Sequence, residues 1–193
     1  YKFAVSWFTW ETTNSPALLG IVAFADTIPM VFMTLIAGAW TDRYGSMMIM
    51  RMCQSIMIAA GVLISIFALT GSLNILYIVV LSFIIGGAEA VTVPARLSLV
   101  HYLVPKNQLS SAVALSSASF NLARFVGPAI AGLFIAIFGV PVTIAIATGM
   151  FIIFYCGLLA LGPGGKIQKD DLPQTNILQD LMGGFRYVFS HAG

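Results

Sequence analysis

The segment GAWTDRYG, residues 38–45, sets an acid, Asp42, beside a base, Arg43, between two long apolar runs. On both sides the chain is almost free of charge over a length that can cross a lipid bilayer. A polar segment in this setting belongs at a membrane surface, where a tight turn joins two transmembrane helices. It therefore predicts a helical membrane protein and is the best clue in the sequence to what the chain does.

The composition of the chain also excludes an ordinary soluble domain. It is 59% hydrophobic and 8% charged, with a mean hydropathy of +0.97, whereas soluble domains carry about 25% charged residues. A helix needs about 20 apolar residues to span a bilayer. We therefore expect an all-α integral membrane bundle over residues 1–162. Its spans are predicted near residues 17–41, 47–70, 74–94, 110–138 and 140–162, with residues 1–10 as the remainder of a truncated first helix.

Basic residues alternate between the predicted loops. The loops near residues 11–16, 70–74 and 138–141 hold no Lys or Arg. The intervening connections hold Arg43, Arg51, Arg96, Lys106, Lys166, Lys169 and Arg186. By the positive-inside rule, the second group lies in the cytoplasm. The net charge of +2 then reflects membrane topology, and no nucleic-acid partner is expected.

After residue 162 the sequence becomes polar and rich in turn-forming residues. Residues 163–193 are therefore predicted to be a cytoplasmic linker. Within it, apolar residues recur at helical spacing near residues 176–190, which predicts an amphipathic helix lying along the membrane surface.

The sequence gives no case for an enzyme. Cys53 and Cys156 are isolated within apolar runs, where a thiol behaves as a small hydrophobic group. His101 and His191 are isolated as well, and no metal-binding or nucleophile–base spacing occurs. We expect no catalytic residue, no cofactor and no metal.

Five stretches of the chain resemble the N-terminal six-helix half of a major facilitator superfamily transporter, within the bacterial exporter branch that includes the enterobactin exporter and the macrolide efflux proteins. They are residues 4–20 (AVSWFTWETTNSPALLG), 38–45 (GAWTDRYG), 93–115 (VPARLSLVHYLVPKNQLSSAVAL), 121–132 (NLARFVGPAIAG) and 180–189 (DLMGGFRYVF). The resemblance implies one half of a twelve-helix transporter, built from two inverted three-helix repeats. Its first helix would be truncated and its C-terminal half absent.

The resemblance also implies a role for the turn at residues 38–45. In the family this turn is thought to latch the two halves of the transporter. Asp42 would then contact a helix of the C-terminal half, and Arg43 would hold a nearby acid. The alternative is a plain turn, in which Gly38 and Gly45 allow close packing and Asp42 and Arg43 face water. The family's turn usually continues with two bases, whereas this chain has Ser46 and Met47.

Ionisable residues inside a bilayer are costly and are functional candidates by default. Asp26, Glu89 and Arg124 lie within predicted spans. Asp26 precedes Pro29 and Arg124 precedes Pro128, at corresponding places if the two repeats are related by inversion. We expect Asp26 and Arg124 either to pair or to bind the coupling ion and the substrate. A purely structural ion pair is the alternative.

Two further predictions concern the fourth and fifth spans. Glu89 is expected within about two turns of its helix end. It would either pair with Arg43 or Arg96, or extend its carboxylate to water at the membrane surface. Gly127, Pro128 and Gly132 resemble the GPxxxG signature of antiporters, which favours export, although Gly-Pro is common in apolar helices.

The predicted function is that of a secondary active transporter in the plasma membrane, surrounded by lipid. We expect proton-coupled efflux of a small amphipathic compound, a drug or a siderophore, by alternating access. The alternatives are a nutrient uptake transporter and, from another class, a receptor or assembly subunit that does not translocate its ligand.

Overall fold

The computed structural model describes residues 1–72 and 74–161, and these residues form helices without a strand. Five helices are long and apolar enough to cross a membrane. The elements are α1 Lys2–Thr13, α2 Pro16–Tyr44, α3 Ser46–Leu69, α4 Ile75–Leu103, the 3-10 turn η1 Lys106–Gln108, α5 Leu109–Phe138 and α6 Val140–Ala160. The predicted linker over 163–193, with its amphipathic helix near 176–190, lies outside the described residues.

The turn between α1 and α2 is set by local chemistry. Asn14 ends α1 in the left-handed conformation, with φ at 46°, and its amide donates to the carbonyl of Trp10. Ser15 then starts α2, because its hydroxyl oxygen accepts from the amide of Leu18 at 3.4 Å and Pro16 occupies the first helical turn. The two helices are therefore joined within a few residues and run antiparallel.

Single glycines make the two tightest turns. Gly45 has φ at 85° and lies between α2 and α3, while Gly139 has φ at 77° and lies between α5 and α6. Both backbone conformations are rarely open to residues with a side chain. The turn predicted from the segment at residues 38–45 is present, with Gly45 as its pivot.

Helix α4 is longer than expected. The sequence placed its end near residue 94, but the helix runs through Pro94 to Leu103. A proline inside a helix removes one backbone hydrogen bond and bends the helix without having to end it. Glu89 is consequently in the middle of α4, which corrects its predicted position near the helix end.

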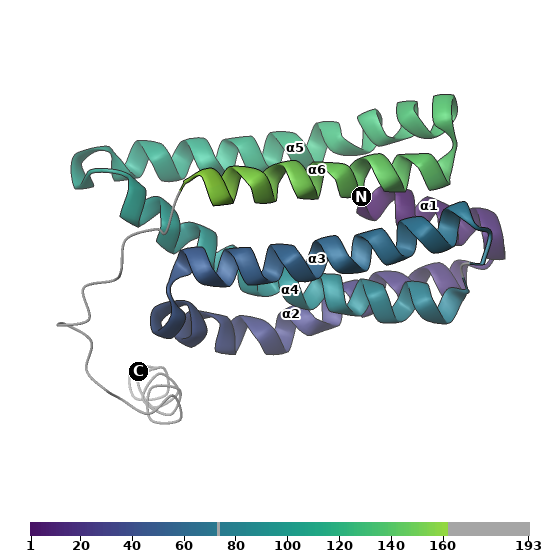
Figure 1. Ribbon diagram of the computed structural model, residues 1–193, viewed down its shortest axis with the longest axis horizontal. Helices are drawn as coiled ribbons and strands as arrows, with labels where there is room; N and C mark the ends of the chain where they lie inside the picture. Colours follow the sequence, from purple (N-terminus) through teal and green to yellow (C-terminus); the bar gives the residue numbers. More distant parts are fainter. Residues whose placement is uncertain (73, 162–193) are drawn as a thin grey trace, which may run out of the picture.

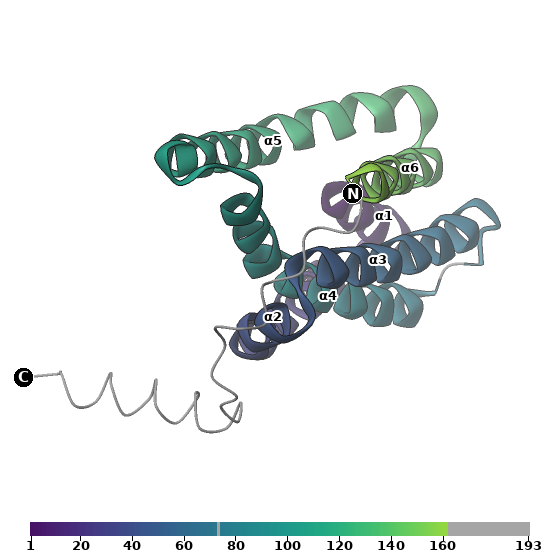
Figure 2. The ribbon, with the colours of Figure 1, turned by 60° about the vertical axis from the view of Figure 1, so that its left-hand side comes forward.

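Helices α2, α3 and α4 pack together as one group, with α6 and α5 on the opposite side of α3 (Figure 1). The main contacts are those of α2 with α4, α3 with α4, and α3 with α6. Among the core side chains, Ile64, Ile78, Ile85 and Ile144 are almost fully buried. Helix α5 differs from the rest: it has no buried residue and stands apart from the α2–α3–α4 group (Figure 2).

Polar side chains tie α3 to α6 inside the apolar bundle. The contacts are Arg51 Nη2 to the carbonyl of Leu158 at 2.8 Å, Gln54 Nε2 to the carbonyl of Phe151 at 3.1 Å, and the hydroxyls of Ser65 and Thr148 at 3.2 Å. Such bonds between helices are typical of membrane bundles, where small and polar residues replace the hydrophobic driving force.

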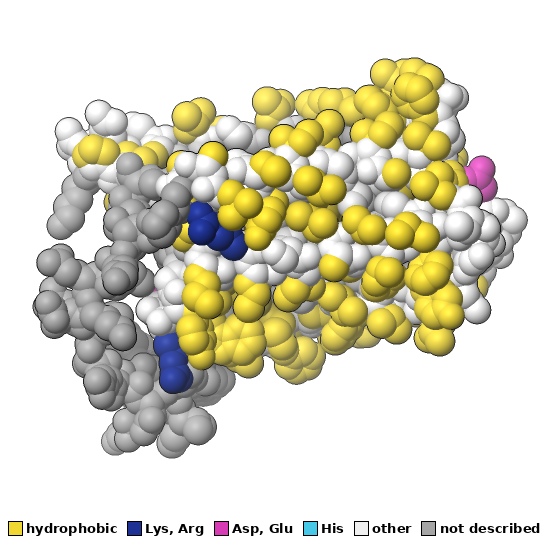
Figure 3. Space-filling view, viewed as in Figure 1, with side chains coloured by type: hydrophobic (Ala, Val, Ile, Leu, Met, Phe, Trp, Pro, Cys, Tyr) yellow, Lys and Arg dark blue, Asp and Glu magenta, His cyan; other side chains and the backbone are white. Residues whose placement is uncertain are grey.

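The outer surface of the bundle is largely apolar. Large hydrophobic side chains are exposed along its length, and Phe125 is the most exposed, at 85%. Figure 3 shows hydrophobic side chains along the visible face, Lys or Arg toward one end and an acid at the other. This distribution fits a multi-pass protein with lipid around its flanks and water at its ends.

Candidate functional site

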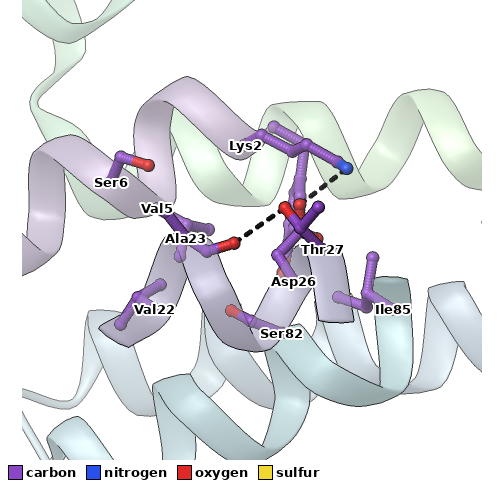
Figure 4. A pocket seen from close by; sticks show the side chains of 10 residues that line it. Lys2, Val5, Ser6, Val22, Ala23, Asp26, Thr27, Ser82 and Ile85 are labelled. Atoms are coloured by element: carbon purple, nitrogen blue, oxygen red, sulfur yellow. Dashed lines mark hydrogen bonds and ion pairs between the residues drawn. The ribbon is translucent and has the colours of Figure 1, made fainter. Parts of the chain in front are cut away.

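The antiparallel arrangement of α1 and α2 brings a base and an acid to the same depth. Lys2 and Asp26 stand equally far along the chain from Asn14 in the turn, roughly 18 Å at the rise of a helix. The ammonium nitrogen of Lys2 lies 2.7 Å from Oδ2 of Asp26. Figure 4 shows Lys2 reaching from α1 to Asp26 on α2.

A second carboxylate reaches the same ammonium from α4. Oε2 of Glu89 lies 2.6 Å from Nζ of Lys2. One turn earlier on α4 is Gly86, where a Cβ atom would overlap the backbone carbonyl of Asp26. The glycine thus permits the close approach of α2 and α4 that lets Lys2 bridge the two acids. We call Lys2, Asp26 and Glu89 the Lys2 triad.

The Lys2 triad carries one negative charge in excess, because one ammonium faces two carboxylates. The side chain of Asp26 is 18% exposed, that of Glu89 36% and that of Lys2 52%. Asp26 and Glu89 both lie on helices of membrane-spanning length, where charges are costly and usually face a cavity or a partner. Binding one further cation or one proton would balance the charge of the triad.

A pocket of about 230 Å³ opens beside the Lys2 triad. Lys2 and Asp26 line it together with Ser6, Thr27 and Ser82, which supply hydroxyl groups to an otherwise apolar wall. The remaining lining residues are Tyr1, Val5, Val22, Ala23 and Ile85. The hollow is small and combines apolar walls with a few convergent polar groups.

The structure does not join Asp26 to Arg124, which corrects one of the two predicted alternatives. Asp26 is paired with Lys2. Arg124 is exposed on α5, with its guanidinium carbon 5.7 Å from the ring centroid of Phe120 one turn earlier. The sequence argument compared depths along the spans, but depth alone does not fix which helices face one another.

Glu89 has a different partner from those predicted. Neither Arg43 nor Arg96 holds it, because Lys2 does. The guanidinium carbon of Arg43 lies 5.6 Å from the ring centroid of Tyr44, at the turn between α2 and α3. Arg96 faces the ring of Phe120. Both arginines therefore contact aromatic rings and not Glu89.

The turn at residues 38–45 exposes its charged pair. Asp42 and Arg43 are both exposed, while Thr41 is buried and donates its hydroxyl to the carbonyl of Ala37 at 2.7 Å. A Cβ atom at Gly38 would meet nothing within 4 Å. Gly45 is therefore required by the turn, whereas the close packing expected at Gly38 is not formed among the described residues.

Gly127, Pro128 and Gly132 lie on α5, away from the core. A Cβ atom at Gly127 or Gly132 would meet nothing within 4 Å, and Pro128 is inside the helix without ending it. These residues are not brought to the Lys2 triad.

Lys2 is the member of the site that sequence reasoning missed. It was set aside because residues 1–10 were treated as an apolar remnant of a helix. The sequence held part of the signal: a lysine and an aspartate equidistant from a turn lie at the same depth if the two helices pack antiparallel, but the rotation of the helices decides whether they meet. In the described part of the chain, no group of three or more His, Cys, Asp or Glu side chains could hold a metal.

Comparison with known proteins gives matches over most of the chain. A family model described as a transmembrane secretion effector, within the major facilitator superfamily, matches residues 1–192. The staphyloferrin A transporter of Staphylococcus aureus is 28% identical over 144 residues, 74% of this chain and 36% of that protein. The multidrug efflux pump Tap of Mycolicibacterium fortuitum is 27% identical over 194 residues, 96% of this chain and 47% of that protein.

A third relative matches the chain with a similar identity and coverage. Macrolide efflux protein A of Streptococcus pyogenes is 26% identical over 145 residues, 75% of this chain and 36% of that protein. The chain thus spans less than half the length of these curated relatives.

Proposed function

The chain belongs to the transmembrane secretion effector family of the major facilitator superfamily, and from this premise we propose that it forms the N-terminal half of a membrane exporter. The family consists of transporters and not of enzymes. Two relatives are named as efflux proteins, one for multiple drugs and one for macrolides, and a third as a staphyloferrin A transporter. The proposed activity is efflux of a small amphipathic compound by alternating access, in which the two halves rock around a central site.

The Lys2 triad is the observation that carries this proposal. Its three helices meet at charged side chains beside a pocket, and the bundle around them is apolar. A structural ion pair needs only one acid for one base. Two acids on one ammonium leave a negative charge that a proton or a cationic substrate can neutralise, which is what coupled transport requires.

In the proposed mechanism the triad couples proton entry to movement of the helices. When one carboxylate takes up a proton, Lys2 remains paired with the other carboxylate, and one of the links from α1 to α2 and to α4 is weakened. The helices are then free to shift relative to each other. Asp26 and Glu89 act as proton acceptors in this scheme, and Arg124, on α5, takes part in binding the substrate.

Two further parts of the chain are assigned roles in the exporter. Asp42 and Arg43 at the exposed turn contact the C-terminal half in one state of the cycle and release it in the other, with Gly38 and Gly45 shaping the turn. Gly127, Pro128 and Gly132 allow α5 to approach a helix of the C-terminal half. The exposure of Asp42 and Arg43, and of α5, supports these roles.

The exporter is proposed to lie in the plasma membrane, with its basic loops and residues 163–193 in the cytoplasm. The distribution of Lys and Arg between the loops supports this orientation.

Transport by the full-length protein in everted membrane vesicles tests the proposal. A fluorescent drug should accumulate in the vesicles only when a proton gradient is imposed. Asp26→Asn and Glu89→Gln should each reduce gradient-driven accumulation by about tenfold or more, a size typical for loss of a group that handles protons. Glu11→Gln, an exposed acid at the end of α1, is the matched control and should keep full transport.

The outcome of this assay separates the alternatives. Movement of substrate in the opposite direction would replace export by uptake, and saturable binding without accumulation would favour a receptor. Undiminished, gradient-driven accumulation in the Asp26→Asn and Glu89→Gln variants would rule out the coupling role of the Lys2 triad.

A further inference from the structure

Two arginines from different helices face one aromatic ring. The guanidinium carbon of Arg96, on α4, lies 4.5 Å from the ring centroid of Phe120, on α5. That of Arg124, also on α5, lies 5.7 Å from the same centroid. We call Arg96, Phe120 and Arg124 the Arg–Phe–Arg cluster. Figure 2 shows the last part of α4 leaving the α2–α3–α4 group and running toward the start of α5.

The positive charge of this cluster is not balanced within the described part of the chain. Both salt bridges found in residues 1–72 and 74–161 belong to Lys2. Nε of Arg96 is buried and has no hydrogen-bond partner there. A ring face attracts a cation, but it accepts no charge and cannot offset the repulsion between two guanidinium groups.

The position of the cluster makes this imbalance costly. Arg96 lies in the membrane-spanning segment Ile75–Val100 and Arg124 in Leu109–Phe138. Arg96 lies near the end of its segment and Arg124 near the middle, and ionised side chains within such segments normally face a partner or a water-filled cavity. The unpaired, buried Nε of Arg96 and the second guanidinium group on the same ring therefore favour a negatively charged group at this site.

We propose that the Arg–Phe–Arg cluster binds an anionic group, a carboxylate or a phosphate, carried by a small acidic compound or by a lipid headgroup. A carboxylate is planar and a phosphate is tetrahedral. A guanidinium group binds two oxygens of either one through two parallel hydrogen bonds. One such group between Arg96 and Arg124 neutralises both and satisfies the free Nε. This proposal rests on the proposed function, because Arg124 is also assigned to substrate binding there, but the binding itself requires no proton gradient and can be measured without transport.

The site is distinct from the Lys2 triad in charge. The triad has an excess of negative charge, whereas the cluster is purely basic. An acidic compound that reaches the exposed Arg124 would therefore be held by the cluster and repelled by the triad. The two sites would sort ligands by charge within one half of the transporter.

Binding to the full-length protein in nanodiscs of zwitterionic lipid tests the proposal. Citrate and inorganic phosphate are the probes, and their binding is measured by titration calorimetry at low salt. The wild type should bind at least one of them saturably, and Arg96→Gln or Arg124→Gln should weaken that binding about tenfold or more, as expected for the loss of a charge-assisted hydrogen bond. Arg124→Lys should weaken it less, because the charge remains.

A ring substitution provides the matched control. Phe120→Leu removes the platform on which both guanidinium groups lie and should weaken anion binding. Phe138→Leu removes an aromatic ring at the far end of the same helix, where Phe138 contacts Phe134 with centroids 5.7 Å apart, and should leave binding unchanged. Because Arg124 is exposed, Arg124→Gln retains the fold and keeps the test valid if Arg96→Gln does not fold.

Nanodiscs that contain phosphatidylglycerol distinguish the two sources of the anion. If a lipid headgroup is the ligand, native mass spectrometry will find this lipid retained by the wild type and lost from Arg96→Gln and Arg124→Gln, and citrate will compete poorly. If a soluble acid is the ligand, citrate binding will be equal in both kinds of disc. No saturable binding of citrate, phosphate or phosphatidylglycerol, or binding that is unaltered in the arginine variants, would overturn the proposal. Both readouts are independent of transport, so a failure here is distinct from a failure of the export assay.

Discussion

Gly86 sets the distance between α2 and α4, because a methyl group at this position would overlap the backbone carbonyl of Asp26. A clash with backbone cannot be relieved by turning a side chain, so the two helices would have to separate. The neighbouring Gly87 is less restricted, since a Cβ there would lie 3.6 Å from Cβ of Pro29. At the scale of single residues, the Lys2 triad therefore depends on a residue that carries no charge.

We predict that Gly86→Ala destabilises the full-length protein by roughly 1–3 kcal/mol, the usual cost of overpacking. It should also weaken the bridge from Lys2 to Glu89, because α4 moves away from α2. Thermal unfolding in detergent is the measurement. Gly20→Ala, on α2, is the control: its Cβ would meet nothing within 4 Å, so the unfolding temperature should stay the same or rise slightly. Equal unfolding temperatures for Gly86→Ala and the wild type would contradict the close approach.

At the scale of the elements, α3 and α6 are joined by the polar contacts described above. We predict that Gln54→Leu costs about 1 kcal/mol, a typical value for a hydrogen bond between membrane helices. The carbonyl of Phe151 lies inside α6, where a backbone amide of the helix donates to it. The carbonyl therefore keeps a hydrogen bond after the substitution. Unfolding in a detergent titration measures the loss.

Ser55→Ala is the control for this prediction. The hydroxyl of Ser55 is exposed and donates to the carbonyl of Arg51 on its own helix, at 2.9 Å. Its removal should not alter the contact between α3 and α6. A Gln54→Leu variant as stable as Ser55→Ala would show that the polar contact adds nothing to the packing.

The helices were more predictable from the sequence than the site. Runs of apolar residues of membrane-spanning length identify helices whatever their neighbours are, and the family match confirms the predicted resemblance. The end of α4 was placed near residue 94, but the helix continues through Pro94 to Leu103. Asp26 and Glu89 could be singled out by the cost of charge in lipid, but their partner could not, because pairing depends on which helix faces lie together.

At the scale of the whole molecule, the turns fall into two groups. Gly45 and the connection at Pro105 lie at one end of the helices, and the turns at Asn14, Gly71 and Gly139 lie at the other. On the face shown in Figure 3, the Lys and Arg side chains lie toward the first end. The proposed orientation places the turns at Asn14, Gly71 and Gly139 outside the cell.

We predict that a membrane-impermeant maleimide labels Ser72→Cys in intact cells and does not label Asn107→Cys until the membrane is opened. Both positions are exposed in turns, so only their side of the membrane differs. The background must lack Cys53 and Cys156, the free cysteines of the described part of the chain. Labelling of Asn107→Cys from outside would reverse the orientation.

Helix α5 buries none of its side chains, and this has a practical consequence for mutational surveys. A screen that scores folding or abundance of this half will find most apolar exchanges on α5 harmless, because few of its side chains pack against the core, Ile135 among them. Positions such as Phe120 and Arg124 would then be recorded as tolerant although they belong to the proposed anion site. Only a selection that demands resistance to a toxic compound, or retention of a bound ligand, will reveal what this helix is for.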